Sequence, residues 1–316
     1  MYDLIQYFKA SDGTEIEYAD LGGNGPVLLF IPGYSLAADL VLPFLSRFRD
    51  AFRCVTMTLR GFGGTTPATK GSEAKGEISL AQAARDIREL MALLDLKDVI
   101  VVGYSMGTHV AFSYIRLFGC ENIARLVILD MTPKLINDDT WNRGLYQGHY
   151  TEERFRADLE AMQTDYQKDF NNYFFYQACV PHTREEARDY IFTEEMQSAV
   201  DAYAATYGVP GLTGSTLTYL APERWSLYRT YWAEMCVHDF RDMLKDITVP
   251  TGILHAMPGS IYDIRTAEYL EEHIPEARRY PIENAVHVSV TRANGADTMK
   301  QLYAFLAEYP LSSAGT

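Results

Sequence analysis

Short apolar runs alternate with longer amphipathic segments over the first 130 residues. Strands are expected where β-branched and other apolar residues run together, at 27–31, 54–59, 99–102 and 125–130. The run Val99–Val102 contains no polar residue, which is typical of a strand buried on both faces. Helices are expected between these strands, at 37–52, 79–94 and 108–118. This alternation predicts an α/β protein with a doubly wound, mostly parallel sheet.

The alternation stops after residue 130 and resumes near residue 250. In between, the pattern predicts only helices, including one from Thr151 onward and one over 222–243. Strands are expected again at 251–256 and 279–282, and helices at 263–273 and 291–308. A helical insertion between two strands of one sheet predicts a cap over the strand ends. We therefore expect an α/β core at 1–130 and 246–316, and an inserted helical cap domain at 131–245.

The stretch Gly103-Tyr104-Ser105-Met106-Gly107 lies between the apolar strand and the next helix. A strand–turn–helix setting of this kind holds the central serine in a strained conformation with its hydroxyl exposed. The flanking glycines remove side chains that would collide with the neighbouring strand and helix. Ser105 is therefore the candidate nucleophile. A serine hydroxyl needs a base and a group that orients the base before it reacts near neutral pH.

Besides the Ser105 motif, three further segments carry a family resemblance: Ile31–Tyr34, Leu59–Gly63 and Val249–His255. Together the four resemble the turns and strands of the α/β-hydrolase superfamily. The resemblance implies a cofactor-free hydrolase fold whose functional groups follow the chain order serine, acid, histidine. It places the base at His287, in the loop after the last strand. The two main-chain donors for an oxyanion are then expected at Tyr34 and Met106.

The acid is harder to place than the nucleophile and the base. The family usually carries it after the seventh strand, but residues 255–263 read His-Ala-Met-Pro-Gly-Ser-Ile-Tyr-Asp, with no carboxylate at the expected position. Asp263 comes a few residues late and is typical of a residue that caps the next helix. Asp130 ends the sixth strand, where some members of the family, including fungal lactonases acting on resorcylic macrolides, place the acid. We take Asp130 as the acid and keep Asp263 as the alternative.

Charge and cysteine spacing exclude several other classes of function. A net charge of −14 disfavours nucleic acid and anionic membranes as partners. The four cysteines lie far apart without C-x-x-C spacing, and neither a metal-ligand cluster nor a phosphate-binding glycine motif is present. The N-terminus lacks the apolar run of a signal peptide. We expect a cytoplasmic enzyme with no metal or other cofactor, and a homodimer is compatible with these features.

The cap holds 20 of the 40 aromatic residues, including all three tryptophans. We expect some of them to line an apolar substrate pocket, with Trp141, Tyr146, Tyr176 and Trp232 as candidates. The sequence thus predicts a serine hydrolase that cleaves a small ester or lactone with an apolar or aromatic portion. A carbon–carbon bond hydrolase or a cofactor-free perhydrolase with the same three residues is the first alternative. A ligand-binding protein on a hydrolase scaffold is the second.

Overall fold

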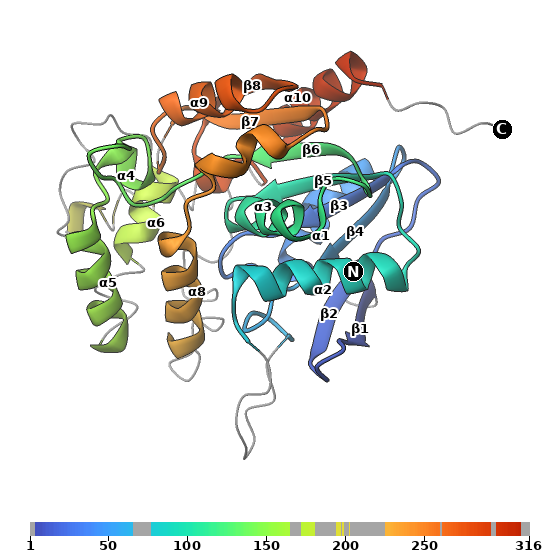
Figure 1. Ribbon diagram of the computed structural model, residues 1–316, viewed down its shortest axis with the longest axis horizontal. Helices are drawn as coiled ribbons and strands as arrows, with labels where there is room; N and C mark the ends of the chain where they lie inside the picture. The colour runs from blue at the N-terminus through green and yellow to red at the C-terminus, as the bar shows by residue number, and fades with distance from the viewer. Residues whose placement is uncertain are drawn as a thin grey trace.

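The fold is built around one eight-stranded sheet (Figure 1). The computed structural model describes residues 4–65, 77–164, 172–180, 194–196, 198, 202, 225–259, 261–291 and 295–310. The strands are β1 (Ile5–Lys9), β2 (Glu15–Asp20), β3 (Val27–Ile31), β4 (Arg53–Met57), β5 (Val99–Tyr104), β6 (Ile123–Leu129), β7 (Thr251–Pro258) and β8 (Ala277–Ala285). Their order is β1-β2-β4-β3-β5-β6-β7-β8. β2 is antiparallel to both of its neighbours, and β3 to β8 are parallel.

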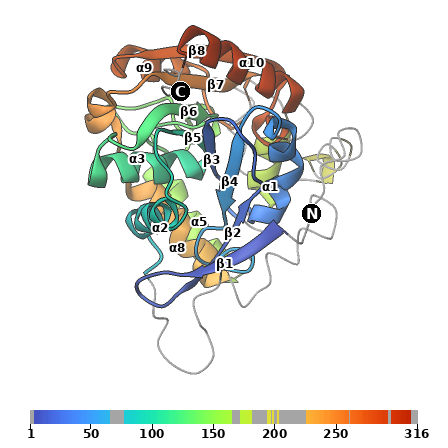
Figure 2. The ribbon, with the colours of Figure 1, turned by 90° about the vertical axis from the view of Figure 1, so that its right-hand side faces the viewer.

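Helices cover both faces of this sheet, which confirms the predicted doubly wound architecture (Figure 2). One face is covered by α2 (Leu80–Leu93), α3 (Met106–Phe118) and α9 (Arg265–His273). The other is covered by α1 (Ala38–Leu45) and α10 (Gly295–Glu308). Successive side chains of β3 point to opposite faces of the sheet. Leu29 packs in the core on the side of α2 and α3, and Leu28 packs in the core on the side of α1 and α10. The central strand β5 is buried along its whole length, as its apolar run predicts.

Several predicted helices differ from the observed ones at their ends, among them those expected at 37–52 and 108–118. The helix expected at 37–52 is divided into α1 and a 3-10 helix, η2 (Ser46–Phe48). Pro43 lies inside α1, where its missing N–H removes one hydrogen bond of the short helix. The helix after the Ser105 motif begins at Met106 rather than at 108, since the backbone turns helical directly after Ser105.

The segment between β6 and β7 contains four helices among the residues that the structure describes. They are α4 (Leu145–Gly148), α5 (Glu152–Thr164), α6 (Asn172–Cys179) and α8 (Trp225–Val237). They gather on the left in Figure 1, beside the sheet. A 3-10 helix, η7 (Arg241–Asp246), then leads into β7. These helices lie where a cap is expected, and the boundaries at 131 and 245 stay a prediction.

A buried arginine ties the turn after β4 to the N-terminal hairpin and to α2. The Arg60 guanidinium binds both carboxylate oxygens of Asp86, at 2.5 and 2.7 Å, and both side chains are fully buried. The same guanidinium donates to Asp12 and, at 3.0 Å, to the Thr14 hydroxyl. Burial raises the pKa of Asp86, whereas Arg60 lowers it. Both charged groups are shielded from water, so removing Arg60 would leave the buried Asp86 carboxylate without a counterion.

We therefore expect Arg60→Ala to lower the free energy of unfolding by about 3–5 kcal/mol, because Asp86 would be left unpaired in the core. Urea unfolding followed by circular dichroism measures the change. Arg156→Ala is the matched control, since Arg156 pairs with Glu152 at 3.0 Å on the exposed face of α5, and such a pair contributes less than about 1 kcal/mol. Equal losses in the two variants would contradict the prediction.

Candidate active site

Ser105 lies at a sharp turn between β5 and α3. Its φ of 52° is in the left-handed region that non-glycine residues rarely adopt. The two flanking glycines are required by close neighbours. A Cβ on Gly103 would lie 2.6 Å from the Thr108 Cα, and a Cβ on Gly107 would collide with the Ile31 carbonyl. The G-x-S-x-G pattern is therefore a packing requirement of this turn, and it presents the Ser105 side chain at the carboxyl end of the sheet.

His287 begins the 3-10 helix η8 (His287–Ser289) directly after β8. Its ring is stacked on Tyr104, with centroids 5.3 Å apart, and meets the ring of Tyr262 edge-on at 5.3 Å. The Tyr104 hydroxyl donates to the His287 carbonyl oxygen at 2.9 Å. These contacts fix both the main chain and the plane of the imidazole, and the side chain is almost completely buried.

The imidazole of His287 joins Ser105 and Asp130 in one series of hydrogen bonds. Its Nε2 lies 3.0 Å from the Ser105 Oγ, and its Nδ1 lies 2.6 Å from the Asp130 Oδ2. The other Asp130 oxygen accepts from the Ala256 N–H at 3.1 Å. With Nδ1 donating to the carboxylate, Nε2 is free of a proton and accepts from the serine hydroxyl. The arrangement suits proton transfer from Ser105 to His287.

Asp263, the alternative acid, has a different partner. Its carboxylate binds the Arg265 guanidinium, with the closest contact at 2.5 Å, and accepts from the Arg265 N–H at 2.9 Å. It thus supports the first turn of α9, the structural role expected for it, although the residue at the cap position itself is Ile264. The structure therefore brings Asp130, rather than Asp263, onto the Nδ1 atom of His287.

The expected main-chain donors lie on two loops that meet at Ser105. Met106 is the first residue of α3, where the N–H has no helical carbonyl to bind. The loop after β3 approaches the same turn so closely that a Cβ on Gly33 would lie 3.0 Å from the Ser105 Cβ. Tyr34 follows, and its hydroxyl donates to the Tyr228 carbonyl of α8 at 2.9 Å. This contact anchors the loop, while the role of both N–H groups stays a prediction.

The four predicted pocket residues differ in their surroundings. Trp232 packs on the Tyr34 ring, with centroids 5.7 Å apart, and donates through Nε1 to the Tyr150 hydroxyl at 2.9 Å. Tyr146 is fully buried against Tyr150 and Tyr173. Tyr176 is half-buried on α6. Trp141 packs on Tyr269 of α9. Of the four, Trp232 thus has a ring contact with a residue of the expected oxyanion loop.

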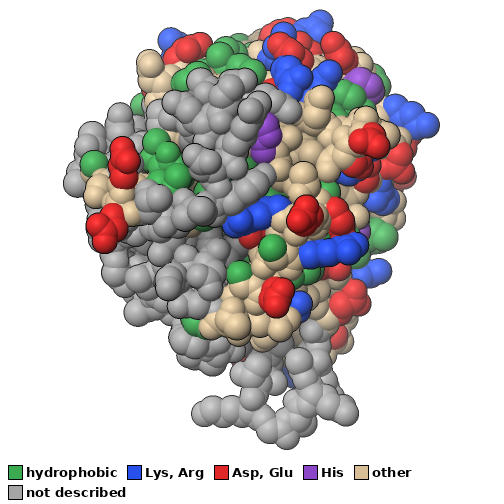
Figure 3. All heavy atoms as spheres, turned by 90° about the vertical axis from the view of Figure 1, so that its left-hand side faces the viewer, with side chains coloured by type: hydrophobic (Ala, Val, Ile, Leu, Met, Phe, Trp, Pro, Cys, Tyr) green, Lys and Arg blue, Asp and Glu red, His purple; other side chains and the backbone are tan. Residues whose placement is uncertain are grey.

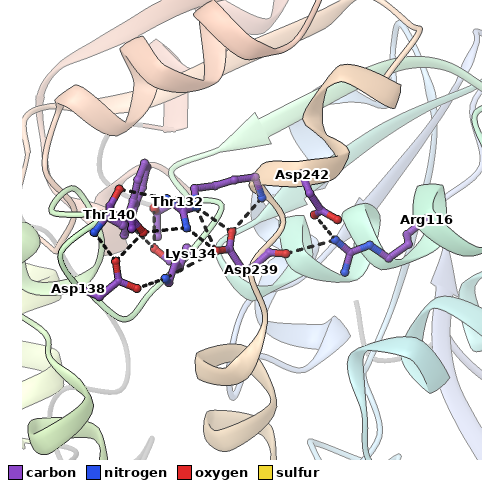
Figure 4. Close-up of polar contacts among 9 residues, drawn as sticks. Arg116, Thr132, Lys134, Asp138, Thr140, Asp239 and Asp242 are labelled. Carbon is purple, nitrogen blue, oxygen red and sulfur yellow. Dashed lines mark hydrogen bonds and ion pairs between the residues drawn. The ribbon is translucent and has the colours of Figure 1, made fainter.

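Charged contacts hold the segment that leaves Asp130 (Figure 4). Lys134 pairs with Asp138 and lies 3.6 Å from the carboxylate of Asp239, with which it also forms a β-bridge. Arg116 on α3 binds Asp242 at 2.6 Å. On the face of the molecule drawn in Figure 3, acidic and basic side chains lie next to one another. The segment that follows α8 is therefore held against both the chain after Asp130 and α3.

Two other histidines near this edge are buried and neutral. Burial lowers the pKa of His109 to about 3, and its Nε2 lies 2.8 Å from the Thr132 carbonyl. Burial also lowers the pKa of His255, and the Asp130 carboxylate opposes only part of this shift. Both are structural residues, as their positions in a helix and a strand suggest. Tyr104 and Tyr262, which hold the His287 ring, were not predicted, because contacts between distant loops leave no local pattern.

A buried acidic group lies in the cap, next to the aromatic cluster. Asp158 on α5 accepts from the Tyr150 hydroxyl at 2.8 Å and pairs with Arg154 at 2.8 Å. Burial raises the pKa of Asp158 to about 6, although Arg154 and Tyr150 lower it. Through Tyr150 this carboxyl is linked to the Trp232 Nε1, and through the ring of Trp232 to Tyr34.

Neither a metal cluster nor a membrane span is found in the described part of the chain. No three His, Cys, Asp or Glu side chains there are placed to hold a metal ion. Among the same residues, no helix combines the length and the apolar character needed to cross a bilayer.

Comparison with known proteins shows which family model and which relatives the sequence matches. The family model described as alpha/beta hydrolase fold matches residues 26–290. A putative non-heme chloroperoxidase from Synechocystis is 26% identical over 281 residues, which are 86% of this chain and 88% of that protein. The non-heme chloroperoxidase CPO-A1 from Kitasatospora aureofaciens is 32% identical over 126 residues, or 40% of this chain and 43% of that one.

Solved structures share the fold at low sequence identity. An esterase from Exiguobacterium antarcticum has a TM-score of 0.70 and 21% identity, over 96% of this chain and 98% of that one. An enol-lactonase from Burkholderia xenovorans has a TM-score of 0.67 and 17% identity, over 96% and 100% of the two chains. These likenesses extend over the insertion as well as the core.

The raised pKa of Asp158 predicts a pH-dependent stability. Because the folded protein holds this proton more tightly than the unfolded chain, the stabilisation is complete below about pH 4 and is lost as the pH rises to about 6. Asp158→Asn removes the titration. We expect the stability of the wild type relative to this variant to fall by about 2–3 kcal/mol between pH 4 and pH 7. Urea unfolding at a series of pH values measures it, and a constant difference would contradict the prediction.

Proposed function

Because the chain belongs to the alpha/beta hydrolase family, we propose that it is a serine hydrolase that cleaves a carboxylic ester or lactone through an acyl-enzyme. The observation that carries the proposal is the hydrogen-bond series from the Ser105 hydroxyl through His287 to Asp130. A nucleophile, a base and an orienting carboxylate stand there within hydrogen-bond distance of one another, before any substrate is bound.

The first half of the reaction follows from this geometry. The Ser105 Oγ attacks the substrate carbonyl carbon while His287 Nε2 takes the hydroxyl proton. The Asp130 carboxylate, 2.6 Å from Nδ1, stabilises the imidazolium that results. The N–H groups of Met106 and Tyr34 bind the oxygen of the tetrahedral intermediate. When that intermediate collapses, His287 returns the proton to the leaving alcohol, or to the ring oxygen of a lactone, and an ester of Ser105 remains.

Water completes the cycle at the same groups. His287 takes a proton from a water molecule that attacks the acyl carbon, and the Ser105 Oγ leaves with the proton that His287 gives back. The products are the carboxylic acid and the regenerated serine. Each step uses the imidazole in the tautomer that Asp130 selects, so the carboxylate acts on both halves of the reaction.

The cap favours a substrate with an apolar or aromatic portion. Phe62, Phe174 and Trp232 each place a ring within about 6 Å of the Tyr34 ring, which adjoins the Ser105 turn. Such surroundings are suited to apolar groups and offer little to compensate a highly charged one. An esterase and an enol-lactonase are among the structural neighbours, which supports an ester or lactone as the bond that is cleaved.

Two alternative functions are a perhydrolase, which would use the same three residues, and a ligand-binding protein, which would use none of them for catalysis. The haloperoxidase names of the relatives favour a perhydrolase as the second candidate, in which hydrogen peroxide replaces water at the acyl-enzyme. The alternative of a ligand-binding protein was suggested by the missing acid after the seventh strand. Asp130 supplies a carboxylate to His287, which argues against that alternative.

Hydrolysis of p-nitrophenyl acetate and butyrate tests the proposed roles. We expect Asp130→Asn to lower kcat by about 10⁴-fold, because the amide no longer selects the right tautomer or stabilises the imidazolium. Asp263→Asn is the matched control: it changes a buried carboxylate that binds Arg265, and kcat is expected to stay within about threefold of the wild type. Ser105→Ala sets the background rate. The reverse result for the two aspartates would assign the acid to Asp263.

Labelling by a fluorophosphonate probe, located by mass spectrometry, separates a hydrolase from a binding protein. Rapid modification of Ser105 is the expected result, since the attack needs only the nucleophile, the base and the oxyanion donors. A wild-type chain that is neither labelled nor active on esters would overturn the proposal.

The two candidate reactions differ in what consumes the acyl-enzyme. The enzyme is given an ester in water that contains millimolar hydrogen peroxide. We expect carboxylic acid to be the main product, because in a hydrolase the acyl-enzyme is attacked by water rather than by peroxide. Titration of peracid and acid gives their ratio. A product that is mostly peracid would select the perhydrolase instead.

A further inference from the structure

A buried carboxylate, that of Glu17 on β2, lies at the edge of the sheet that carries Ser105. Glu17 is paired with Thr58, the residue after β4, whose N–H donates to the Glu17 carbonyl oxygen at 2.8 Å. The Glu17 Oε1 accepts from the Thr58 hydroxyl, and Oε2 accepts from the Tyr7 hydroxyl at 3.2 Å. The main chain closes over this group, because a Cβ on Gly64 would lie 2.2 Å from Oε2. The carboxylate is thus enclosed, and no step of the proposed reaction uses it.

The Thr58 hydroxyl connects this carboxylate to the start of α1. It donates to Glu17 and accepts from the Ala38 N–H at 2.8 Å. Ala38 is the first residue of α1, where an N–H has no helical carbonyl to bind, and the cap residue Ala37 has no polar side chain to replace one. A hydroxyl that donates to a carboxylate is polarised and is therefore a better acceptor. The two side chains together supply the acceptor that the start of α1 lacks.

The bond to α1 holds one end of the loop that carries Tyr34. This loop, residues 32–37, contains a turn in which the Leu36 N–H donates to the Gly33 carbonyl oxygen at 3.3 Å. Ser35, at the third position of the turn, has a φ of 62°, in the region that residues other than glycine rarely adopt. Such a conformation persists only where the surroundings impose it. The sheet holds the loop at the end of β3, and the hydroxyl after β4 holds it at the start of α1.

We propose that Glu17 and Thr58 are positioning residues, which hold this loop so that the Tyr34 N–H faces the oxygen of the tetrahedral intermediate. This inference rests on the proposed function. The loop already adjoins the nucleophile, since a Cβ on Gly33 would lie 3.0 Å from the Ser105 Cβ. Neither positioning side chain touches the substrate or exchanges a proton with it. Both act through the main chain of the loop.

The energetic reason is that a donor to an oxyanion must be aligned before the negative charge develops. Misplacement of such a group by about 1 Å can slow a reaction about 100-fold. A loop released from α1 lets Ser35 return to a more favourable φ, and the neighbouring Tyr34 N–H turns with it. Because the substrate carbonyl carries little charge before attack, the loss is expected in kcat, with KM nearly unchanged.

Thr58→Val tests the pair by removing the hydroxyl at nearly constant volume. We expect kcat for p-nitrophenyl butyrate to fall between about 10- and 100-fold, with KM within about threefold of the wild type. Thr58→Ser keeps the hydroxyl, and both constants are expected to stay within about threefold. Thr56→Val is the matched control, since Thr56 is equally buried and donates at 2.9 Å to the Phe30 carbonyl of β3, and its kcat is expected to equal that of the wild type. Equal losses of kcat in the two valine variants would overturn the inference.

Inhibition by trifluoroacetophenone distinguishes a positioning role from a general loss of folded protein. This ketone accepts the Ser105 oxygen at its carbonyl carbon and forms a tetrahedral oxyanion, so it reports on the oxyanion donors without turnover. Its inhibition constant is expected to rise in Thr58→Val by the factor by which kcat/KM falls. A lowered kcat with an unchanged inhibition constant would overturn the inference.

Moving the carboxylate gives a second test, in which activity is regained. Glu17→Gln is expected to lower kcat about 10-fold, because a neutral amide polarises the Thr58 hydroxyl less. In the double variant E17Q/T58D the carboxylate stands at position 58 and binds the Ala38 N–H directly, so kcat is expected to return to within about threefold of the wild type. A double variant no faster than Glu17→Gln would overturn the inference while leaving an active hydrolase. A wild type that is neither labelled by the fluorophosphonate nor active on esters would overturn the proposed function, and this inference with it.

Discussion

The parallel pairing of β5, β6 and β7 is the constraint on which the site depends. In this register Tyr104 is opposite Leu129, and Leu129 is opposite Leu254. The residues that follow, Ser105 and Asp130, continue the ladder, since the Ser105 N–H donates to the Leu129 carbonyl and the Asp130 N–H to the Leu254 carbonyl. Parallel strands end at one edge of a sheet, so Ser105 and Asp130 are adjacent because their strands are adjacent.

At this edge the backbone leaves regular conformations, and the sheet supports the departure. Ser105 and Asp130 both have positive φ angles, of 52° and 51°. Each such angle is unfavourable for a residue with a side chain. The fully buried strand β5 and the ladder bonds on either side hold both residues in place. The side chains are thereby turned toward His287, which begins η8, the 3-10 helix that follows β8.

The cap and the core are joined at the groups around Ser105. The Tyr34 hydroxyl binds the main chain of α8, and the Tyr262 carbonyl binds the Gln147 side chain of α4. These two helices, which lie between β6 and β7, are therefore tied to the loop that follows β3 and to the loop that follows β7.

The sequence by itself determined the alternation of strands and helices and the turn at Ser105, whereas the family resemblance implied the place of His287. The alternation and the turn depend on local physics, such as an apolar run that must be buried and two glycines that neighbours leave no room to replace. Asp130 was predicted as the acid because it ends the strand next to Ser105, and only the tertiary structure shows its carboxylate 2.6 Å from the His287 Nδ1. The surroundings of Tyr262 and Trp141 were decided only by the tertiary structure. Tyr262 contacts Met131 and Trp141 contacts Tyr269, in each case more than 100 residues away along the chain, and such contacts leave no signal in the sequence.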